Sequence, residues 1–211
     1  MTFRFPAVLF CLSVAGCTSL PTLPPPDPSA LAAWQSHGNS LRRLDNWQLQ
    51  GRFALHSGDT HWTGNIYWAR HRDSYRIQLS SPLGQGLIVL TSDFTGASLQ
   101  TATEQQFHDT DAESLFANTL GWDLPLNSLG YWITGQPAPD EPHRYALTPQ
   151  GYLEELYQNR WHLQYLGYRS DTQPVLPRKL ALEGRKIRLK LVVDNWTLLD
   201  NAQPVESIIL N

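Results

Sequence analysis

The chain has few cysteines and no long apolar run beyond its first residues. Both cysteines, Cys11 and Cys17, lie within the first 17 of its 211 residues, so no disulfide can staple the remainder. No later segment is apolar over the roughly 20 residues that a membrane-spanning helix needs. The length suits one domain. Its core must hold itself together, and 41% hydrophobic residues, with eight Trp, eight Tyr and seven Phe, can supply one.

Positive charge is scarce. Arg4 is the only charged residue among the first 16; without that segment the chain has 15 Lys and Arg against 19 Asp and Glu, a formal net charge of −4. Nucleic acid is therefore not expected as a partner. The sequence also lacks a Gly-x-x-x-x-Gly-Lys phosphate loop and a Gly-x-Ser-x-Gly nucleophile elbow, and its seven histidines are dispersed. We expect neither an enzyme nor a bound cofactor.

The first 16 residues have the layout of a secretory signal peptide. Arg4 precedes an apolar run from Phe5 to Val14 that is too short to cross a bilayer as a helix. Small residues, Val14-Ala15-Gly16, then lead into Cys17, an arrangement that resembles the lipobox of bacterial lipoproteins. Cleavage there would free Cys17 as an N-terminus that can be acylated. The alternative is an ordinary cleaved signal that happens to contain a cysteine.

Acylation of Cys17 would fix the protein to a membrane. Each buried CH₂ contributes about 0.8 kcal/mol, so one chain anchors marginally whereas two or three anchor firmly. Thr18 follows the cysteine, where an aspartate would favour retention in the inner membrane under the sorting logic that a lipobox implies. We therefore expect a protein anchored through Cys17 to the periplasmic face of the outer membrane.

Residues 17–28 are interpreted as the lipidated cysteine and a tether. The stretch Leu-Pro-Thr-Leu-Pro-Pro-Pro-Asp-Pro, residues 20–28, is rich in proline, which lacks an amide donor and favours an extended backbone. A helix is expected to follow from Ser29, which we take as its N-cap, although Gly38 weakens it. Its apolar side is formed by Leu31, Trp34, Leu41 and Leu44.

A two-residue alternation then predicts strands. Trp47, Leu49, Gly51, Phe53 and Leu55 alternate with polar residues, which is typical of a strand with one apolar face. Further strands are predicted at residues 62–68, 75–79, 87–91, 98–102, 145–148, 160–165, 179–182 and 187–193. The connections at 57–59 and 70–74 are polar hairpin material.

Two helices are expected among the strands. Thr110-Asp111-Ala112-Glu113 reads as a capping box, and Gly121 is placed to end that helix. A second helix, residues 125–134, opens with Pro125 and stops at Gly135. These elements predict a mainly β domain with helices, of the α+β class, over residues 29–198. Its antiparallel sheet must curl into a barrel or partial barrel, or pack on another layer. Residues 199–211 are interpreted as an appendage, with 208–210 as a possible edge strand.

Several motifs behind the lipobox resemble, as a set, the LolB family of outer-membrane lipoprotein receptors. They are Ser81-Pro82-Leu83-Gly84, Pro125-Leu126-Asn127-Ser128-Leu129 with Trp132-Ile133 and Gly135, Gln173-Pro174 with Pro177, and Ile187-Arg188-Leu189-Lys190 with Asp194-Asn195-Trp196. The resemblance runs from about Trp34 to Trp196. The proline-rich tether and the residues after Trp196 depart from the family pattern.

The resemblance implies an incomplete antiparallel β-barrel closed by helices around an apolar cavity. Such a cavity would accept the acyl chains of lipoproteins delivered by the periplasmic carrier LolA, for insertion into the inner leaflet of the outer membrane, whose phospholipid is then a further partner. We expect a monomer. The candidate lining of the cavity is Trp47, Leu49, Phe53, Leu55, Ile66, Trp68, Ile77, Leu79 and Leu189, although for any single one of these residues a place in a filled core is favoured.

Leu83 is a second candidate site. It lies between Pro82 and Gly84 in a turn, where periodicity gives no reason for an apolar side chain. In the family that the motifs resemble, the matching leucine projects towards the membrane, so we assign Leu83 to membrane contact during delivery. Without the resemblance, a leucine that caps the sheet from within would be the default.

Two other interpretations stay open. A scaffold lipoprotein of the outer membrane would use its aromatics for core and protein interface, and would bind a stable protein partner and no lipid. His56, Asp59 and His61 could surround a metal, but they lie in or beside a hairpin turn, which favours a solvated loop.

Overall fold

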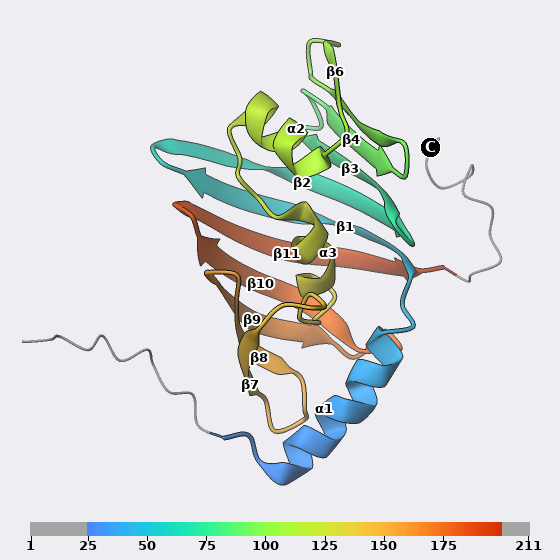
Figure 1. The fold of residues 1–211 in the computed structure, drawn as a ribbon, viewed down its shortest axis with the longest axis vertical. Helices are drawn as coiled ribbons and strands as arrows, with labels where there is room; N and C mark the ends of the chain where they lie inside the picture. Colours follow the sequence, from blue (N-terminus) through green and yellow to red (C-terminus); the bar gives the residue numbers. More distant parts are fainter. Residues whose placement is uncertain (1–24, 200–211) are drawn as a thin grey trace, which may run out of the picture.

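The computed structural model describes residues 25–199, which form one antiparallel sheet of eleven strands with three helices (Figure 1). The strand order is β6-β5-β4-β3-β2-β1-β11-β10-β9-β8-β7. The strands are β1 Asn46–Ser57, β2 Thr60–His71, β3 Ser74–Ser80, β4 Ile88–Asp93, β5 Gly96–Gln100, β6 Gln106–Asp109, β7 His143–Leu147, β8 Leu153–Gln158, β9 Trp161–Arg169, β10 Leu176–Gly184 and β11 Ile187–Leu198.

The sheet is curved but does not close. Strands β6 and β7 are its two edges, and β1 lies at its centre, paired with β2 on one side and with β11 on the other. Side chains that alternate along the strands are buried on the concave face, as at Trp47, Leu49, Phe53 and Leu55 of β1. The predicted mainly β class and the incomplete antiparallel barrel with helices are confirmed.

Helix α1, Pro28–Leu41, lies beside β7 and the β7–β8 turn (Figure 1). Its N-cap is Asp27, whose carboxylate accepts a 2.8 Å hydrogen bond from the Ser29 amide. The prediction of Ser29 as the cap was therefore wrong: Asp27 has the same capping chemistry and precedes Pro28, which is favoured in a first turn. The ring of Trp34 packs 5.8 Å from that of Tyr145, which holds the helix to β7.

Helices α2, Ala112–Leu120, and α3, Leu126–Trp132, lie over the concave face (Figure 1). Asp111, and not Thr110, caps α2, with its carboxylate accepting from the Glu113 and Ser114 amides. Glu113 does not turn back to the cap as a capping box requires. Its carboxylate accepts from the Asn127 amide at 2.9 Å and so joins α2 to α3. We call residues 112–133, which end at the C-cap of α3, the roof.

Glycines end both helices of the roof. Gly121 has a φ of 73° and Gly135 a φ of 84°, in the left-handed region that favours glycine. A β-carbon on Gly135 would also lie 3.3 Å from the ring of Pro177, so α3 ends in close contact with β10. The predicted ends of both helices are confirmed within a residue or two.

Two strands, β6 and β8, were not predicted. All four residues of β6 are exposed, so this edge strand has no apolar face to produce a pattern. In β8 the fully buried residues Leu153 and Leu156 are three apart, and the sixth residue, Gln158, is a buried polar side chain. Neither segment shows the simple alternation on which strand prediction depends.

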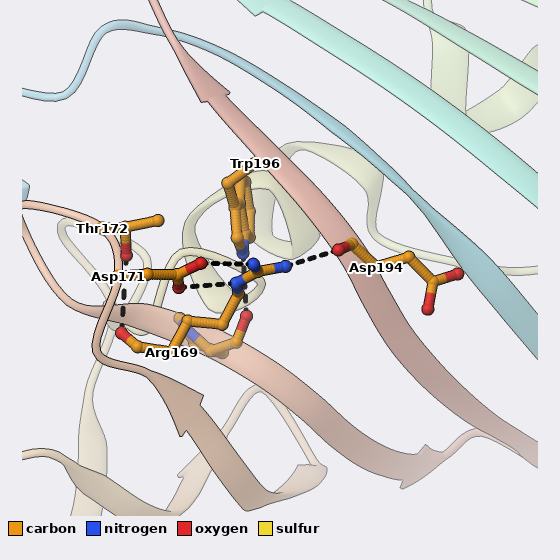
Figure 2. A network of polar contacts seen from close by, with 6 residues as sticks. Arg169, Asp171, Thr172, Asp194 and Trp196 are labelled. Atoms are coloured by element: carbon orange, nitrogen blue, oxygen red, sulfur yellow. Dashed lines mark hydrogen bonds and ion pairs between the residues drawn. The ribbon is translucent and has the colours of Figure 1, made fainter.

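A polar network joins β9 to β11 at one end of the sheet (Figure 2). The Arg169 guanidinium donates to the Asp171 carboxylate and to the backbone carbonyl of Asp194. The Trp196 indole donates to the Pro177 carbonyl at 2.9 Å. Two of the motifs quoted above, around Pro177 and Trp196, therefore meet in space.

Several expectations fall outside the described residues. They concern the leader, Cys17, the tether up to residue 24, and the appendage from residue 200, including its possible edge strand. Among the described helices, none is long and apolar enough to cross a bilayer.

Candidate functional site

An apolar cavity of about 40 Å³ lies between the concave face of the sheet and the roof. Its wall is formed entirely by apolar side chains. The sheet contributes Phe53, Leu55, Ile66, Trp68, Ile77, Leu79, Leu189 and Leu191, and the other side contributes Phe116, Trp122, Leu124, Leu126, Leu129 and Ile133. The wall carries no charged group, and the only polar side-chain atoms in it are the indole N–H groups of Trp68 and Trp122, so it suits hydrocarbon better than a polar ligand.

Strand periodicity and register bring the sheet side of this wall together. Residues 53 and 55 point inward from β1, and antiparallel pairing sets Leu55 opposite Leu189 of β11. In the next pair, Trp68 of β2 is opposite Ile77 of β3. Four strands, β1, β2, β3 and β11, thus contribute inward-facing apolar side chains to the same cavity.

Seven of the nine residues proposed as lining lie on this wall. Trp47 and Leu49 do not. They are buried nearer the start of β1, where the Trp47 ring packs 5.5 Å from Trp196 and 5.7 Å from Trp68. Periodicity assigns all five inward residues of β1 to one face, but it does not say which part of that face the roof covers.

The roof supplies lining residues that the sequence did not identify. Trp122 is central: its ring lies 5.5 Å from Phe116, 5.5 Å from Trp62 and 6.3 Å from Phe53, each edge-on. The sequence did give a signal for Leu126, Leu129 and Ile133, because they are apolar residues of the helix predicted at 125–134. Trp122 and Leu124 lie in the link between helices, where no period applies.

The roof is tied to the sheet by buried hydrogen bonds at the C-terminal end of α3. At the C-terminal end of α3, the Trp132 indole donates to the Gln158 side chain at 2.8 Å, and the Tyr165 hydroxyl donates to the Trp132 carbonyl at 2.8 Å. These bonds are buried, and burial raises the pKa of Tyr165 well above its usual value.

Elsewhere the roof is held by surface contacts and apolar packing. Asp123 pairs with Arg185 of the β10–β11 turn at 3.1 Å, with both side chains largely exposed. Such exposed pairs contribute at most about 1 kcal/mol. Burial raises the pKa of the Glu113 carboxyl, which links α2 to α3 within the roof itself. The segment around Trp122, between α2 and α3, is therefore held to the rest of the protein by apolar packing and this exposed ion pair.

Leu83 lies on a hydrogen-bonded turn between β3 and β4. The Gly84 amide donates to the Ser81 carbonyl at 2.8 Å, and the Asn65 side chain donates to the same carbonyl at 3.1 Å. The leucine side chain is 87% exposed. It does not cap the sheet from within, so that default reading is wrong; its role in membrane contact stays a prediction.

His56 and His61 lie side by side on β1 and β2, with rings 4.2 Å apart. Burial, the neighbouring His61 ring and the cationic Arg188 and Lys190 lower the pKa of His56. Across residues 25–199, no three His, Cys, Asp or Glu side chains are grouped closely enough to hold a metal ion.

Comparison with known proteins identifies the family. The family model described as "Outer membrane lipoprotein LolB" matches residues 45–196. The chain belongs to the LolB family. It is 33% identical over 191 residues to the outer-membrane lipoprotein LolB of Stutzerimonas stutzeri, covering 90% of this chain and 93% of that one. It is 36% identical over 186 residues to LolB of Nitrosococcus oceani, covering 88% and 92%.

Membership of the LolB family places this chain at the outer membrane as a lipoprotein. A solved structure supports the fold alone: a putative outer membrane lipoprotein-sorting protein domain from Vibrio parahaemolyticus superposes with a TM-score of 0.52 at 7% identity. That match covers 83% of this chain and 94% of the other. The LolB match includes the Leu83 turn, the roof and the strands that carry the cavity wall.

Proposed function

We propose that this protein receives acylated lipoproteins from the periplasmic carrier LolA and inserts them into the inner leaflet of the outer membrane. The observation that carries the proposal is the wholly apolar cavity between the concave sheet and the roof. Membership of the LolB family, whose relatives are outer-membrane lipoproteins, supports it. No catalytic step is included in the proposal.

The cavity must expand to hold an acyl chain. Its volume of about 40 Å³ is close to the roughly 30 Å³ that one water molecule occupies in the liquid, and far below the roughly 300 Å³ of small ligand pockets. The roof is buried at Trp132 but tied near Trp122 mainly by apolar contacts and one exposed ion pair. An acyl chain would therefore displace the segment around Trp122, between α2 and α3, and replace its contacts with its own.

Transfer between two apolar cavities needs no nucleotide. The acyl chains remain out of water throughout, and a preference of about 1.4 kcal/mol for the receiving cavity already gives a tenfold direction. The sequence contains no phosphate-loop motif that would suggest another energy source.

Delivery would use the Leu83 turn and the anchor. One leucine in a bilayer gains only about 0.3–0.6 kcal/mol, so Leu83 can perturb lipid packing but cannot hold the protein there. Acylated Cys17 would do that, with residues 18–26 as the tether between the membrane and the N-cap of α1. The protein would act as a monomer that contacts phospholipid through the exposed turn.

An acyl-fluorophore titration tests the proposal. The chain from residue 17 onward, with Cys17→Ala to remove the anchor, should brighten an acyl-linked fluorophore, and a lipoprotein loaded on LolA should displace it. Native mass spectrometry should then show a one-to-one complex with the acylated protein. If the fluorophore neither brightens nor is displaced, the cavity is a filled core and the proposal fails.

A further inference from the structure

The end of the strands at which Leu83 lies also has a groove with a cationic lining. The β8–β9 turn, the β10–β11 turn and edge strand β7 border this groove, which has a volume of about 920 Å³. Five of its lining residues are cationic and one is a carboxylate: Arg144, Arg160, Arg185, Lys186, Arg188 and Glu183. We call it the cationic groove.

This positive charge is concentrated in a protein that is otherwise acidic. The full sequence has a formal net charge of −3, yet residues 178–190 hold six Arg or Lys residues and one Glu. The chain's three lysines, Lys179, Lys186 and Lys190, are all in this segment. Strands β10 and β11 bury leucines inward, and the cations are on the exposed positions between them.

Much of this charge is unneutralised. Among the described residues, Arg160, Lys186 and Arg188 have no carboxylate within ion-pair distance, whereas Arg185 pairs with Asp123. Glu183 is directly opposite Arg188 in the strand register, but its carboxylate approaches the His162 ring instead, at 3.7 Å. The groove therefore presents guanidinium and ammonium groups that can take an anion.

The two turns hold these cationic residues in a backbone conformation that long side chains rarely adopt. Arg160 has a φ of 62°, and Arg185 and Lys186 have φ values of 48° and 66°. Glycine or asparagine would adopt this left-handed region more readily than long side chains do. Strained positions filled by residues that local propensity disfavours are a reason to look for function.

The groove and several exposed apolar side chains lie at the same end of the strands. In an antiparallel sheet the β1–β2, β3–β4, β8–β9 and β10–β11 connections all lie at one end of the strands. Leu83 projects from the second of these connections, and Trp62, 48% exposed, lies just after the first. Apolar side chains together with Lys and Arg are the combination that a membrane surface containing anionic lipid attracts.

We propose that the cationic groove binds the phosphate groups of anionic phospholipids. This binding docks the same end of the sheet on the membrane, where Leu83 contacts the acyl region. The inference rests on the proposed function in one respect, that a delivering protein must meet a bilayer. Arginine suits the role because its planar guanidinium can donate two parallel hydrogen bonds to a phosphate.

Vesicle binding by charge-neutral turn variants tests the proposal. The chain from residue 17 onward with Cys17→Ala is sedimented with vesicles of phosphatidylcholine alone, or of phosphatidylcholine mixed with phosphatidylglycerol. Arg160→Asn with Lys186→Asn removes two charges and puts asparagine where φ is positive, so the fold should be kept. Binding to the mixed vesicles should fall about 30-fold, from about 1 kcal/mol for each cation near an anionic surface.

The matched control removes two charges from the opposite end of the strands. Arg72 lies in the β2–β3 turn with a φ of 54°, and Arg43 follows α1; both are exposed. Arg72→Asn with Arg43→Gln should leave binding to the mixed vesicles within twofold of the unsubstituted chain. Equal losses in the two double variants would mean that net charge alone sets the binding, and would overturn a groove.

Three further outcomes would also overturn the proposal. One is unchanged binding of the turn variant to mixed vesicles. Another is binding of inorganic phosphate by the unsubstituted chain without any binding to mixed vesicles, which would indicate a site for free phosphate. The third is a turn variant that binds vesicles normally but receives less lipoprotein from LolA, which would make the groove a protein-docking surface.

Acyl-fluorophore binding, measured alongside, should be unchanged in both variants. Its absence from the unsubstituted chain would remove the proposed function but not the groove.

Discussion

The indole nitrogen of Trp132 donates a 2.8 Å hydrogen bond to the buried side-chain oxygen of Gln158, and this bond ties the end of α3 to β8. The same oxygen accepts from the Ala138 amide at 2.8 Å, and the Gln158 amide group donates to the carbonyls of Ala138 and Glu141. One side chain therefore satisfies four backbone or side-chain groups where water is excluded.

Gln158→Leu should destabilise the protein strongly. The substitution keeps the volume but leaves the Trp132 and Ala138 N–H groups buried without partners, which should lower the free energy of unfolding by roughly 2–5 kcal/mol. Urea unfolding followed by tryptophan fluorescence measures it. Gln164→Leu, an exposed position on the adjacent strand β9, is the control and should change stability by less than about 0.5 kcal/mol. Similar losses in the two variants would argue against the role given to Gln158.

Ile66→Asn should weaken acyl-chain binding. Ile66 lines the cavity and is only partly buried, so the amide can remain solvated in the free protein. A bound hydrocarbon would strip that hydration at a cost of about 1–3 kcal/mol, which should weaken acyl-fluorophore binding by about tenfold or more. Leu166→Asn, on the outer face of β9, should bind as the unsubstituted chain does. Equal affinities would place the acyl chain elsewhere.

Leu83→Glu should separate receiving cargo from delivering it. The side chain is already in solvent, so stability and uptake from LolA should be kept. A carboxylate at full depth in a bilayer costs roughly 2.5–3.5 kcal/mol, so insertion into liposomes should slow markedly. Phe94→Glu provides the control, because Phe94 is 94% exposed on the turn at the other end of β4 and should deliver normally. Delivery at the unsubstituted rate by the Leu83 variant would disprove the assignment.

Cys17→Ala should block lipidation. Without the thiol the predicted lipobox cannot be acylated, so the cell should accumulate a precursor that retains its leader. Mass spectrometry of the membrane fraction measures both. A normally lipidated, membrane-fixed product from this variant would show that the anchor is elsewhere.

Acid should loosen the contact of α1 with the sheet. The His37 ring lies 4.9 Å from Tyr152, and burial lowers the pKa of His37 below its ordinary value of 6.5. The folded protein then binds this proton more weakly than the unfolded chain, so unfolding takes up a proton and stability falls as pH decreases below about 6.5. Urea midpoints across that range should decline less steeply in His37→Gln. An identical slope would mean that other groups set the acid sensitivity.

The sequence predicted the fold better than it predicted the site. Alternation in β1 and its neighbours was sufficient for an antiparallel sheet with one apolar face, because burial on one face requires that period. The same rule fails where a strand is fully exposed, as in β6, or where a buried glutamine replaces an apolar residue, as at Gln158. It cannot distinguish Trp47 from Phe53 either, since both point inward and only the position of the roof decides which meets the cavity. The cationic groove depends on turns distant in sequence, so composition gave no sign of it.

The register that sets Trp47 opposite Leu198 joins the first strand of the domain to the last. Synthesis and export proceed from the N-terminus, so β1 can form its hairpin with β2 early but keeps a bare edge until β11 has emerged. Contacts this distant in sequence slow folding, and an unpaired edge invites pairing with other chains. A chain that stops before Ile187 would lack the strand that joins the two halves of the sheet. Truncation should therefore yield a substrate for periplasmic proteases, and not a smaller working receptor.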